Sequence, residues 1–482
     1  MSRPSRRDFV KAAAAAAGAV LVPPALHDRS VDRALGGQAS AIAEEHGWER
    51  VPSILARIKA PTFAARVFPV TRYGAKSDGV TDSGAAFRRA IAACAAAGGG
   101  RVVVEGGTFL TGPIHLRSRV NLEVKEGATI RFLTDPKAYE QYVLTRFEGV
   151  ELMGLSPLIY AYHAHDIAIT GRGTLDGQAG NTVWWHWNGS PRYGWKQGAG
   201  NQRAARAQLF EMAERNVPVA SRRFGVDSYL RPPFIQPYGC TNVLVEGVTI
   251  RNSPMWEINP VLCHNVTVRG VQIASHGPNN DGCDPESCRD VLIEHCLFDT
   301  GDDCIAIKSG RNADGRRVNV PTENVIIRDC EMRDGHGGVT IGSEISGGVR
   351  HVYAERNKMD SPQLDRALRF KNNAMRGGVL EHIYMRDVEV GQLADSVLQV
   401  DFLYEEGANG DFPPVVRDVE LLRVTSRKST YALYLRGYDK GTIEDVRVID
   451  CTFDGVAKPD VVEHVTGLVR RNVTVNGAKV TQ

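Results

Sequence analysis

The sequence has no apolar run long enough to cross a membrane, no excess of one charge and no metal-binding spacing of cysteines. Its longest apolar stretch, near the N-terminus, falls short of the roughly 18 residues that a spanning helix needs, so we expect a soluble mature protein. The 58 Lys and Arg nearly balance the 56 Asp and Glu, for a net charge of +2. Such a chain has no overall field that attracts nucleic acid, and an anionic substrate needs locally placed cations.

The nine cysteines are scattered and odd in number, so at least one is unpaired. None has a second cysteine three residues later, as common zinc motifs require, and we predict no metal and no cofactor. Cys296, Cys330 and Cys451 occupy one position of the repeat described below. This favours small buried side chains over disulfide bonds at these three positions.

Residues 1–28 have the pattern of a targeting segment, with Arg6 and Arg7 ahead of an apolar run that ends in small residues and prolines. The stretch "SRRDFVK" resembles the twin-arginine export signal, which predicts export by the twin-arginine machinery to the periplasm, or secretion, in a Gram-negative-type bacterium. A general secretory signal and a basic amphipathic arm are the alternatives.

A pattern of alternating hydrophobic residues recurs along the chain, as in "TNVLVEGVTI", "HNVTVRGVQI", "RDVLIEHCLF" and "ENVIIRDCEM". The period of two indicates strands, and the steps of 23 to 36 residues place insertions in the turns. Stacked units of this kind predict an all-β, single-domain, right-handed parallel β-helix over residues 66–482, preceded by an extension at 29–65. The units begin at Thr241, His264, Arg289, Glu323, Arg350, Glu381, Arg417 and Glu444.

Three segments depart from this repeat. An amphipathic helix beginning near Asp82 is expected to cap the open N-terminal end of the stack, and a second helix is expected within residues 41–59. Residues 180–230 form a long insertion with its own helix, which is typical of a functional segment near a substrate groove. Its aromatic residues either stack on sugar rings or form a small separate core: Trp184, Trp185, Trp187, Tyr193 and Trp195.

Carboxylates gather where successive units end. Asp281 follows one unit, in "NNDGCD", and the adjacent Asp302 and Asp303 follow the next. Equivalent positions on neighbouring coils lie about 4.8 Å apart, so the three carboxylates are expected to share one face. Hydrolysis of a glycosidic bond needs a protonated acid and a carboxylate that activates water. Repulsion within the adjacent pair is expected to raise one pKa and keep that group protonated.

Cationic residues follow on later coils. His336 lies in "DGHGG", and Arg369 and Lys371 lie two residues apart, so on a strand they point to the same face and clamp a carboxylate. Each motif alone is most often a turn or a solvated surface, but their conjunction in one turn region of successive coils indicates a site. Acidic and cationic groups side by side favour a sugar acid as substrate.

These motifs resemble those of glycoside hydrolase family 28, the polygalacturonases and their relatives. The resemblance covers about residues 66–460 and departs from the family at Asn280, at Phe370 and in the missing cysteine partner of Cys304, which puts a family disulfide in doubt. The four family motifs read Asn279-Asn280-Asp281, Gly301-Asp302-Asp303, Gly335-His336-Gly337 and Arg369-Phe370-Lys371.

The resemblance implies an inverting hydrolase of α-1,4-galacturonosidic bonds in pectic substrates. Asp302 would be the general acid, Asp281 and Asp303 would hold the attacking water, and His336 would tune Asp302 and contact the substrate. The residues that it implies for substrate binding are Asn279, Arg369, Lys371 and Tyr404.

The insertion at 180–230 favours action from the chain end, because it would close one end of the groove. Three alternatives remain at this point: a hydrolase of rhamnogalacturonan or xylogalacturonan, a calcium-dependent pectate lyase, and a non-catalytic carbohydrate-binding solenoid. His336 beside two acids argues for hydrolysis over elimination, and a binding protein has no reason to gather these groups.

Overall fold

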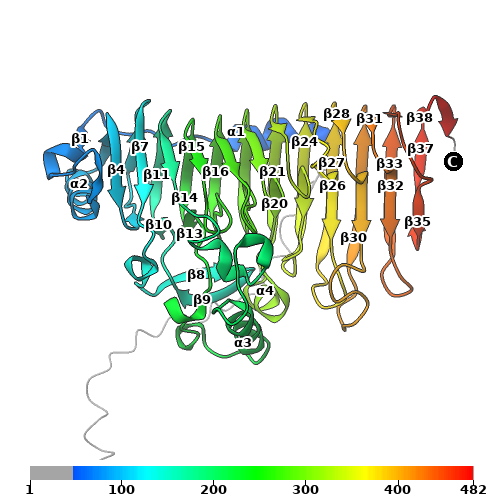
Figure 1. Cartoon of the computed structure of the whole chain (residues 1–482). Coiled ribbons are helices and arrows are strands. Elements are labelled where there is room, and N and C mark those ends of the chain that lie inside the picture. Colours follow the sequence, from blue (N-terminus) through cyan, green and yellow to red (C-terminus); the bar gives the residue numbers. More distant parts are fainter. Residues whose placement is uncertain (1–46, 481–482) are drawn as a thin grey trace, which may run out of the picture. The chain divides into compact units, whose positions relative to one another are not determined.

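The repeated units lie in register on successive coils of a right-handed parallel β-helix (Figure 1). The computed structural model describes residues 47–480. In the first of its sheets, the opening residue of each predicted unit pairs with the opening residue of the next, from Thr241 with His264 to Arg417 with Glu444. The predicted fold class is confirmed, and the units pair in the register in which their sequences align.

Three long parallel sheets make the walls of the solenoid. The first sheet consists of β1 (Val67–Pro69), β3 (Gly100–Val104), β6 (Val120–Val124), β11 (His165–Gly171), β14 (Thr241–Glu246), β16 (His264–Arg269), β18 (Arg289–Glu294), β21 (Thr322–Arg328), β24 (Val349–Glu355), β27 (Val379–Arg386), β30 (Val415–Leu422), β33 (Ile443–Ile449), β36 (Val465–Thr466) and β37 (Val469–Arg471). The second consists of β2 (Asp78–Asp82), β4 (Gly107–Thr111), β7 (Ala128–Phe132), β12 (Thr174–Asp176), β15 (Thr249–Arg251), β17 (Gln272–Ser275), β19 (Leu297–Thr300), β22 (Glu331–Met332), β25 (Lys358–Met359), β28 (Glu389–Gln392), β31 (Thr425–Lys428), β34 (Thr452–Phe453), β38 (Val473–Val475) and β39 (Ala478–Val480).

The third wall carries the residues of the site. It has an N-terminal part of β5 (Ile114–His115), β10 (Ile159–Tyr162) and β13 (Ile235–Tyr238), and a C-terminal part of β20 (Ile305–Ile307), β23 (Val339–Ile341), β26 (Arg366–Lys371), β29 (Ser396–Asp401), β32 (Tyr431–Arg436) and β35 (Val461–Glu463). Isolated bridges through Ile258 and Cys283 connect the two parts across the intervening coils.

The second residue of each repeated unit is polar because its backbone adopts the left-handed conformation. Asn and Asp tolerate positive φ better than other side chains that carry a Cβ. The side chains of these second residues also form hydrogen bonds between successive coils. For example, Asn265 Nδ2 donates to Asn242 Oδ1 across 2.7 Å. These residues, with φ between 53° and 58°, are Asn242, Asn265, Asp290, Asn324, His351, His382, Asp418 and Asp445.

The interior of the solenoid is apolar and includes all nine cysteines, each of them buried and free. The expectation of small buried side chains at Cys296, Cys330 and Cys451 therefore agrees with the structure.

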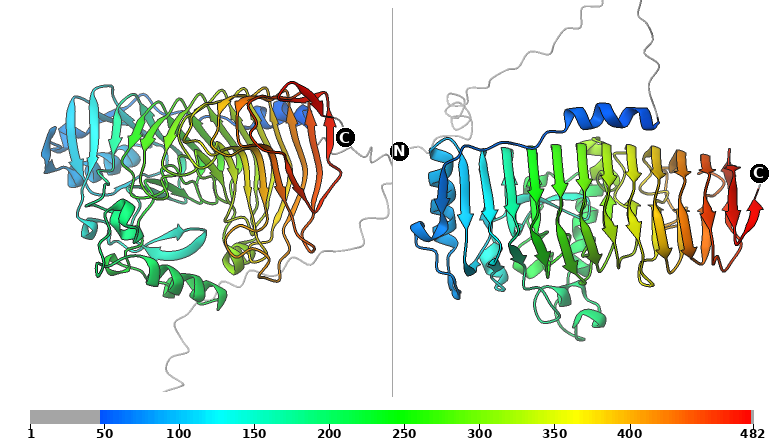
Figure 2. Two further views of the ribbon diagram at one scale, coloured as in Figure 1. Left: turned by 45° about the vertical axis from the view of Figure 1, so that its right-hand side comes forward. Right: turned by 90° about the horizontal axis from the view of Figure 1, so that it is seen from above.

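The predicted helix near Asp82 forms as α2 (Gly84–Ala96), with Phe87, Ala90 and Ile91 buried against the first strands. Its capping role stays a prediction. The helix expected within residues 41–59 forms as α1 (Val51–Arg57), which lies along the first sheet (Figure 2).

Residues 1–46, with the predicted export signal, lie outside the described part of the chain, and no test of that prediction follows from the structure. Between residues 47 and 480, no helix has the length and apolar character needed to cross a membrane.

A side structure packs against the third wall. It contains an antiparallel hairpin, β8 (Val143–Phe147) and β9 (Val150–Gly154), the helix α3 (Arg203–Glu214) of the predicted insertion, and α4 (Asn312–Val318), which follows β20 in the chain. The three elements lie together beside the strand stack (Figure 1). A buried ion pair of 2.8 Å between Arg222 and Asp314 fixes the insertion to α4.

Candidate active site

Asp303 is fully buried at the entrance to β20 and is held by two cations from β26. Lys371 Nζ donates to Asp303 Oδ2 across 2.6 Å, and Arg369 donates to Oδ1 across 3.2 Å. The hydroxyl of Thr340 also donates to Oδ1, at 2.9 Å. Burial acts to raise the pKa of Asp303, but Lys371 and Arg369 outweigh it and hold the pKa well below its usual range. Asp303 is therefore an ionised carboxylate.

Asp302 points the other way, toward His336 on the next coil. Nδ1 of His336 lies 3.1 Å from Asp302 Oδ1, which also accepts a hydrogen bond from the Asp303 backbone N–H. This bond raises the pKa of His336 above its ordinary value. Burial acts most strongly and raises the pKa of Asp302, but the hydrogen bond and charge of His336, together with the charge of Lys371, outweigh it, and the net pKa is lowered.

The expectation that repulsion between Asp302 and Asp303 dominates is therefore wrong for the unliganded site. The charge of Asp303 does act to raise the pKa of Asp302, as expected, but His336 counters it. The hydrogen bond between the two side chains thus acts to lower the pKa of Asp302 and to raise that of His336.

Asp281 carries the raised pKa instead. Burial, Asp284 and Asp302 raise it well above its usual range, in that order of importance. Its Oδ1 is buried without a hydrogen-bond partner, and its Oδ2 lies 3.7 Å from Lys308 Nζ. A carboxylate oxygen left unpartnered in a buried site is poised to accept a proton or a water hydrogen.

Oxygens of the three carboxylates lie within 4.8 Å of one another, so the structure brings the acidic set together as expected. Such a cluster is also a possible cation site. Here the compensating charges come from the protein itself, because Lys371 and Arg369 bond to Asp303.

A pocket of about 400 Å³ opens in front of these groups. It is lined by Asn279, Asp281, Asp302, His336, Arg369, Lys371 and Tyr404 among the predicted site residues, and Asp303 lies directly behind Lys371. The ring of Tyr404 is 5.7 Å from Lys371 Nζ and 5.8 Å from the Arg369 guanidinium, so it stands over both cations. The eight residues predicted from sequence thus converge on one pocket.

Comparison with known proteins places the chain in the family that its site motifs resemble. Residues 225–473 match the family model described as Glycosyl hydrolases family 28. The chain belongs to this family. Within family 28, it is 45% identical to a hyperthermoactive exopolygalacturonase from Thermotoga maritima, with a TM-score of 0.88 over 90% of this chain and 97% of that one.

Two curated relatives are more distant. An exo-poly-alpha-D-galacturonosidase of Dickeya chrysanthemi is 28% identical over 381 residues, 73% of this chain and 60% of the relative. A probable polygalacturonase of Vitis vinifera is 29% identical over 325 residues, 65% of this chain and 58% of the relative. The family 28 chain thus spans about 60% of the length of these relatives.

Asn280, which departs from the family motif, braces the site from behind. Its side-chain oxygen accepts from Ser275 and from the Gly277 N–H, both at 2.7 Å, and its amide nitrogen donates to two backbone carbonyls. The neighbouring Asn279 accepts a 2.7 Å bond from the buried Arg231 and faces the pocket. The departure at Asn280 therefore changes a structural side chain rather than one in the pocket.

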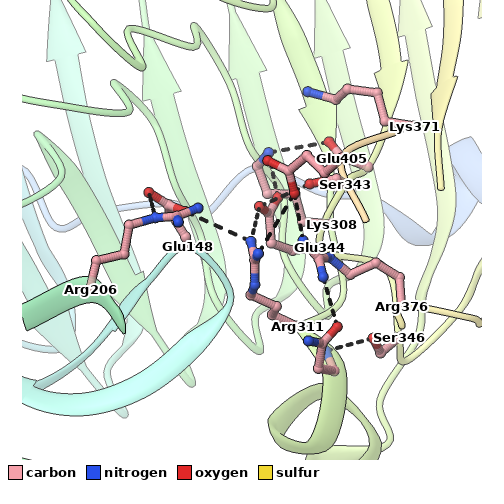
Figure 3. Close-up of polar contacts among 12 residues, drawn as sticks. Glu148, Arg206, Lys308, Arg311, Ser343, Glu344, Ser346, Lys371, Arg376 and Glu405 are labelled. Carbon is pink, nitrogen blue, oxygen red and sulfur yellow. Dashed lines mark hydrogen bonds and ion pairs between the residues drawn. The ribbon is translucent and has the colours of Figure 1, made fainter. Parts of the chain in front are cut away.

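Sequence reasoning missed a group of charged residues that line the pocket or form ion pairs with its lining. We call it the charged wall, and it includes Glu148 from the β8–β9 turn and Arg206 from α3, which form a bidentate ion pair (Figure 3). Other missed pocket residues include Trp256 and Lys308. The full wall consists of Glu148, Arg206, Arg311, Glu344 and Glu405.

The aromatic residues of the insertion mainly form core. Trp184 and Trp187 are buried and make edge contacts with each other at 4.9 Å, and Trp187 also contacts Tyr229. The insertion contributes polar and charged residues to the pocket lining instead: Asn188, Gln202, Arg203 and Arg206. The structure therefore favours the second of the two interpretations of these aromatics.

Proposed function

We propose that this protein hydrolyses α-1,4-galacturonosidic bonds of polygalacturonate or oligogalacturonides, with inversion, from the chain end. The observation that carries the proposal is the buried pairing of two cations with Asp303 in a pocket that also holds Asp302 and Asp281. One site thereby offers cations for a sugar carboxylate and carboxylates for bond cleavage.

The proposed reaction needs one proton donated and one removed. A proton held by the Asp302–His336 pair passes from Asp302 to the glycosidic oxygen as the bond to the anomeric carbon breaks. A water held by Asp281 and Asp303 forms the new bond to that carbon and gives its proton to Asp281. Asp281 suits this role because its Oδ1 is unpartnered and its pKa is raised, whereas Asp303 is fixed in ion pairs.

Substrate binding follows from the cations. Arg369 and Lys371 retain further N–H groups for the carboxylate of the sugar, and Tyr404 lies over both. Asn279 lies in the lining beside Asp281 and is proposed to contact a sugar hydroxyl.

Action at the chain end is supported by the charged wall. Glu148 and Arg206 belong to the side structure, and Arg311 ties them to the coil that carries Lys308, at 3.8 Å from Glu148. A wall fixed in this way blocks the passage of a continuing chain. The names of the Thermotoga and Dickeya relatives agree with this mode of attack.

The alternatives fit the site less well. A calcium-dependent lyase needs free carboxylates for its cation, yet both oxygens of Asp303 already accept hydrogen bonds from Arg369, Thr340 and Lys371. A binding solenoid has no use for a buried, unpartnered oxygen on Asp281, which costs free energy. A decorated pectin, rhamnogalacturonan or xylogalacturonan, is the remaining alternative.

The domain division and the export route belong to the same proposal. Residues 1–28 would direct export by the twin-arginine route, and the β-helix with its insertion would act in the periplasm or outside the cell. Changing Arg6 and Arg7 to Lys together, followed by fractionation of the native host, tests the route, since retention in the cytoplasm is expected.

The activity is tested by following reducing ends, unsaturated ends and product sizes together on polygalacturonate. Reducing ends without unsaturated products, and galacturonate monomer or dimer from the earliest times, are expected. Unsaturated products that require calcium would indicate elimination. Product only from rhamnogalacturonan or xylogalacturonan would move the substrate to a decorated pectin.

A further inference from the structure

Lys308 is a buried cation that the motifs do not include. It lies just after β20, five residues beyond Asp303, and is 2% exposed. Three groups contact its ammonium. Nζ donates to Glu344 across 3.1 Å and to the Gly342 carbonyl across 3.3 Å, and Nζ lies 4.5 Å from the centre of the Trp256 ring. Figure 3 shows Lys308 beside Glu344 at the charged wall.

Glu344 is itself held in place. Arg311 lies 3.6 Å from its Oε1, and the hydroxyl of Ser343 donates to the same oxygen at 3.2 Å. Lys308 and Arg311 outweigh the effect of burial and keep the pKa of Glu344 well below its usual range. The ammonium of Lys308 is therefore anchored to a fixed anion.

The two carboxylates proposed to hold the water differ in their cations. Asp303 has Lys371 and Arg369 at hydrogen-bonding distance. For Asp281, Lys308 is the cation found within 4 Å among residues 47–480, at 3.7 Å. Asp281 is buried near other acids, and a carboxylate in such a place needs a nearby cation to be ionised.

We propose that Lys308 is a positioning residue for Asp281: it lies beside the carboxylate and favours its ionised form, against burial and the neighbouring acids, so that Asp281 accepts the proton of the attacking water. The inference rests on the proposed hydrolytic function. Lys308 acts through Asp281: the bond between water oxygen and the anomeric carbon forms as the water O–H proton moves to Asp281.

Asp284 lies on the far side of the same ammonium. Its Oδ2 is 3.8 Å from Lys308 Nζ, it is fully buried, and neither of its oxygens has a hydrogen-bond partner. It is absent from the pocket lining, and its charge acts both on Lys308 and on Asp281, whose pKa it raises. The charged groups that face Lys308 are Asp281, Asp284, Glu286, Asp303, Glu344 and Lys371.

The test compares wild type with Lys308→Met, which keeps the stem but loses the charge, and with Lys308→Arg, which keeps a charge. Lys308→Met is expected to lower kcat on trigalacturonate by about 10–100-fold. This is only part of the rate enhancement that a general base contributes, because Asp281 itself remains. KM should change little, the acidic limb of the kcat profile should move to higher pH, and Lys308→Arg should restore part of both effects. Lys358→Met, on an exposed lysine of β25, is the matched control.

A second readout needs no turnover. The carboxyl infrared band that disappears in Asp281→Asn is followed as pH rises in wild type and in Lys308→Met. The band should persist to higher pH in Lys308→Met, because the cation that favours ionisation is gone. Should Lys308→Met fail to fold, Lys308→Gln takes its place in both measurements.

The outcomes separate the two proposals. A raised KM with unchanged kcat would make Lys308 a substrate ligand and overturn the inference, as would an infrared band that titrates identically in both proteins. No product from wild type on any galacturonate substrate would contradict the proposed function, while the infrared comparison would still decide whether Lys308 controls Asp281.

Discussion

Lys371 Nζ lies 2.6 Å from Asp303 Oδ2, although the two residues are 68 positions apart in the chain. The contact joins β26 to the entrance of β20, two coils away in the third wall. A cation expected to bind the substrate carboxylate therefore also holds the carboxylate of Asp303 ionised. In the proposed function, substrate binding and water activation share this lysine.

Replacing Lys371 by Met should reduce both functions. Asp303 loses its closest cation, so its pKa should rise, and the acidic limb of the kcat/KM profile should move to higher pH. The loss of a charged donor in a buried site predicts a fall in kcat/KM of about 100-fold or more. Steady-state kinetics on trigalacturonate across the pH range measure this. An unchanged profile would show that Asp303 does not depend on Lys371.

The Asp302–His336 pair predicts a loss of activity at high pH. The pKa of His336 is raised by its bond to Asp302, so its stabilising charge is fully present below the ordinary pKa of about 6.5 and disappears as pH rises through the raised pKa. The basic limb of kcat/KM should lie above that ordinary value. In His336→Gln the limb should be displaced and activity reduced. A basic limb that is identical in both proteins would assign it to another group.

The charged wall should determine product size. Changing Arg206 of the wall and Arg203, a second pocket-lining cation of α3, to Ala together removes both cations from the lining and releases Glu148 from its ion pair. The share of longer oligogalacturonides among early products of polygalacturonate should rise, as judged by chromatography. Arg215→Ala, at the C-terminal end of the same helix and in an exposed ion pair with Glu211, should leave the product pattern unchanged. An unaltered pattern in the double variant would mean that the wall does not enforce attack from the chain end.

The N-terminal helix α1 should stabilise the fold without affecting catalysis. Ile54 is completely buried against the first sheet, beside Ile326 and Tyr353. Ile54→Ala should cost about 2–4 kcal/mol of unfolding free energy. Thermal unfolding should show a lower Tm, with kcat unchanged at 25 °C, and Ser53→Ala should serve as the exposed control. Equal Tm values for Ile54→Ala and wild type would show that α1 contributes little.

The fold, and the acidic and cationic residues that meet at the pocket, could be predicted from the sequence. Period-two hydrophobicity and a polar second residue recur in every unit, so the pairing of Thr241 with His264 follows from aligning one unit with the next. The four motifs fall at equivalent turns, and stacking brings equivalent turns together. This is why Asp281, Asp302 and Asp303 converge as expected.

The charged wall and the acid–base balance could not be predicted in this way. Glu148 meets Arg311 because a hairpin outside the repeat folds back on the solenoid, a contact that no periodicity encodes. Lys308 follows an apolar strand like an ordinary solvated lysine, and its burial depends on Trp256 and Glu344. The lowered pKa of Asp302 depends on the direction of the His336 ring, which residue order does not specify.

The most direct test of the account is a proton NMR time course of the mature protein acting on trigalacturonate. Oxygens of the three carboxylates lie within 4.8 Å of one another, closer than the roughly 6.5–9.5 Å carboxyl separation of most inverting glycosidases, so the stereochemical outcome is informative. We predict that β-galacturonate and digalacturonate appear first, with the α-anomer following only by mutarotation. Initial formation of the α-anomer would contradict inversion, and an unsaturated product or no cleavage would contradict the hydrolytic site itself.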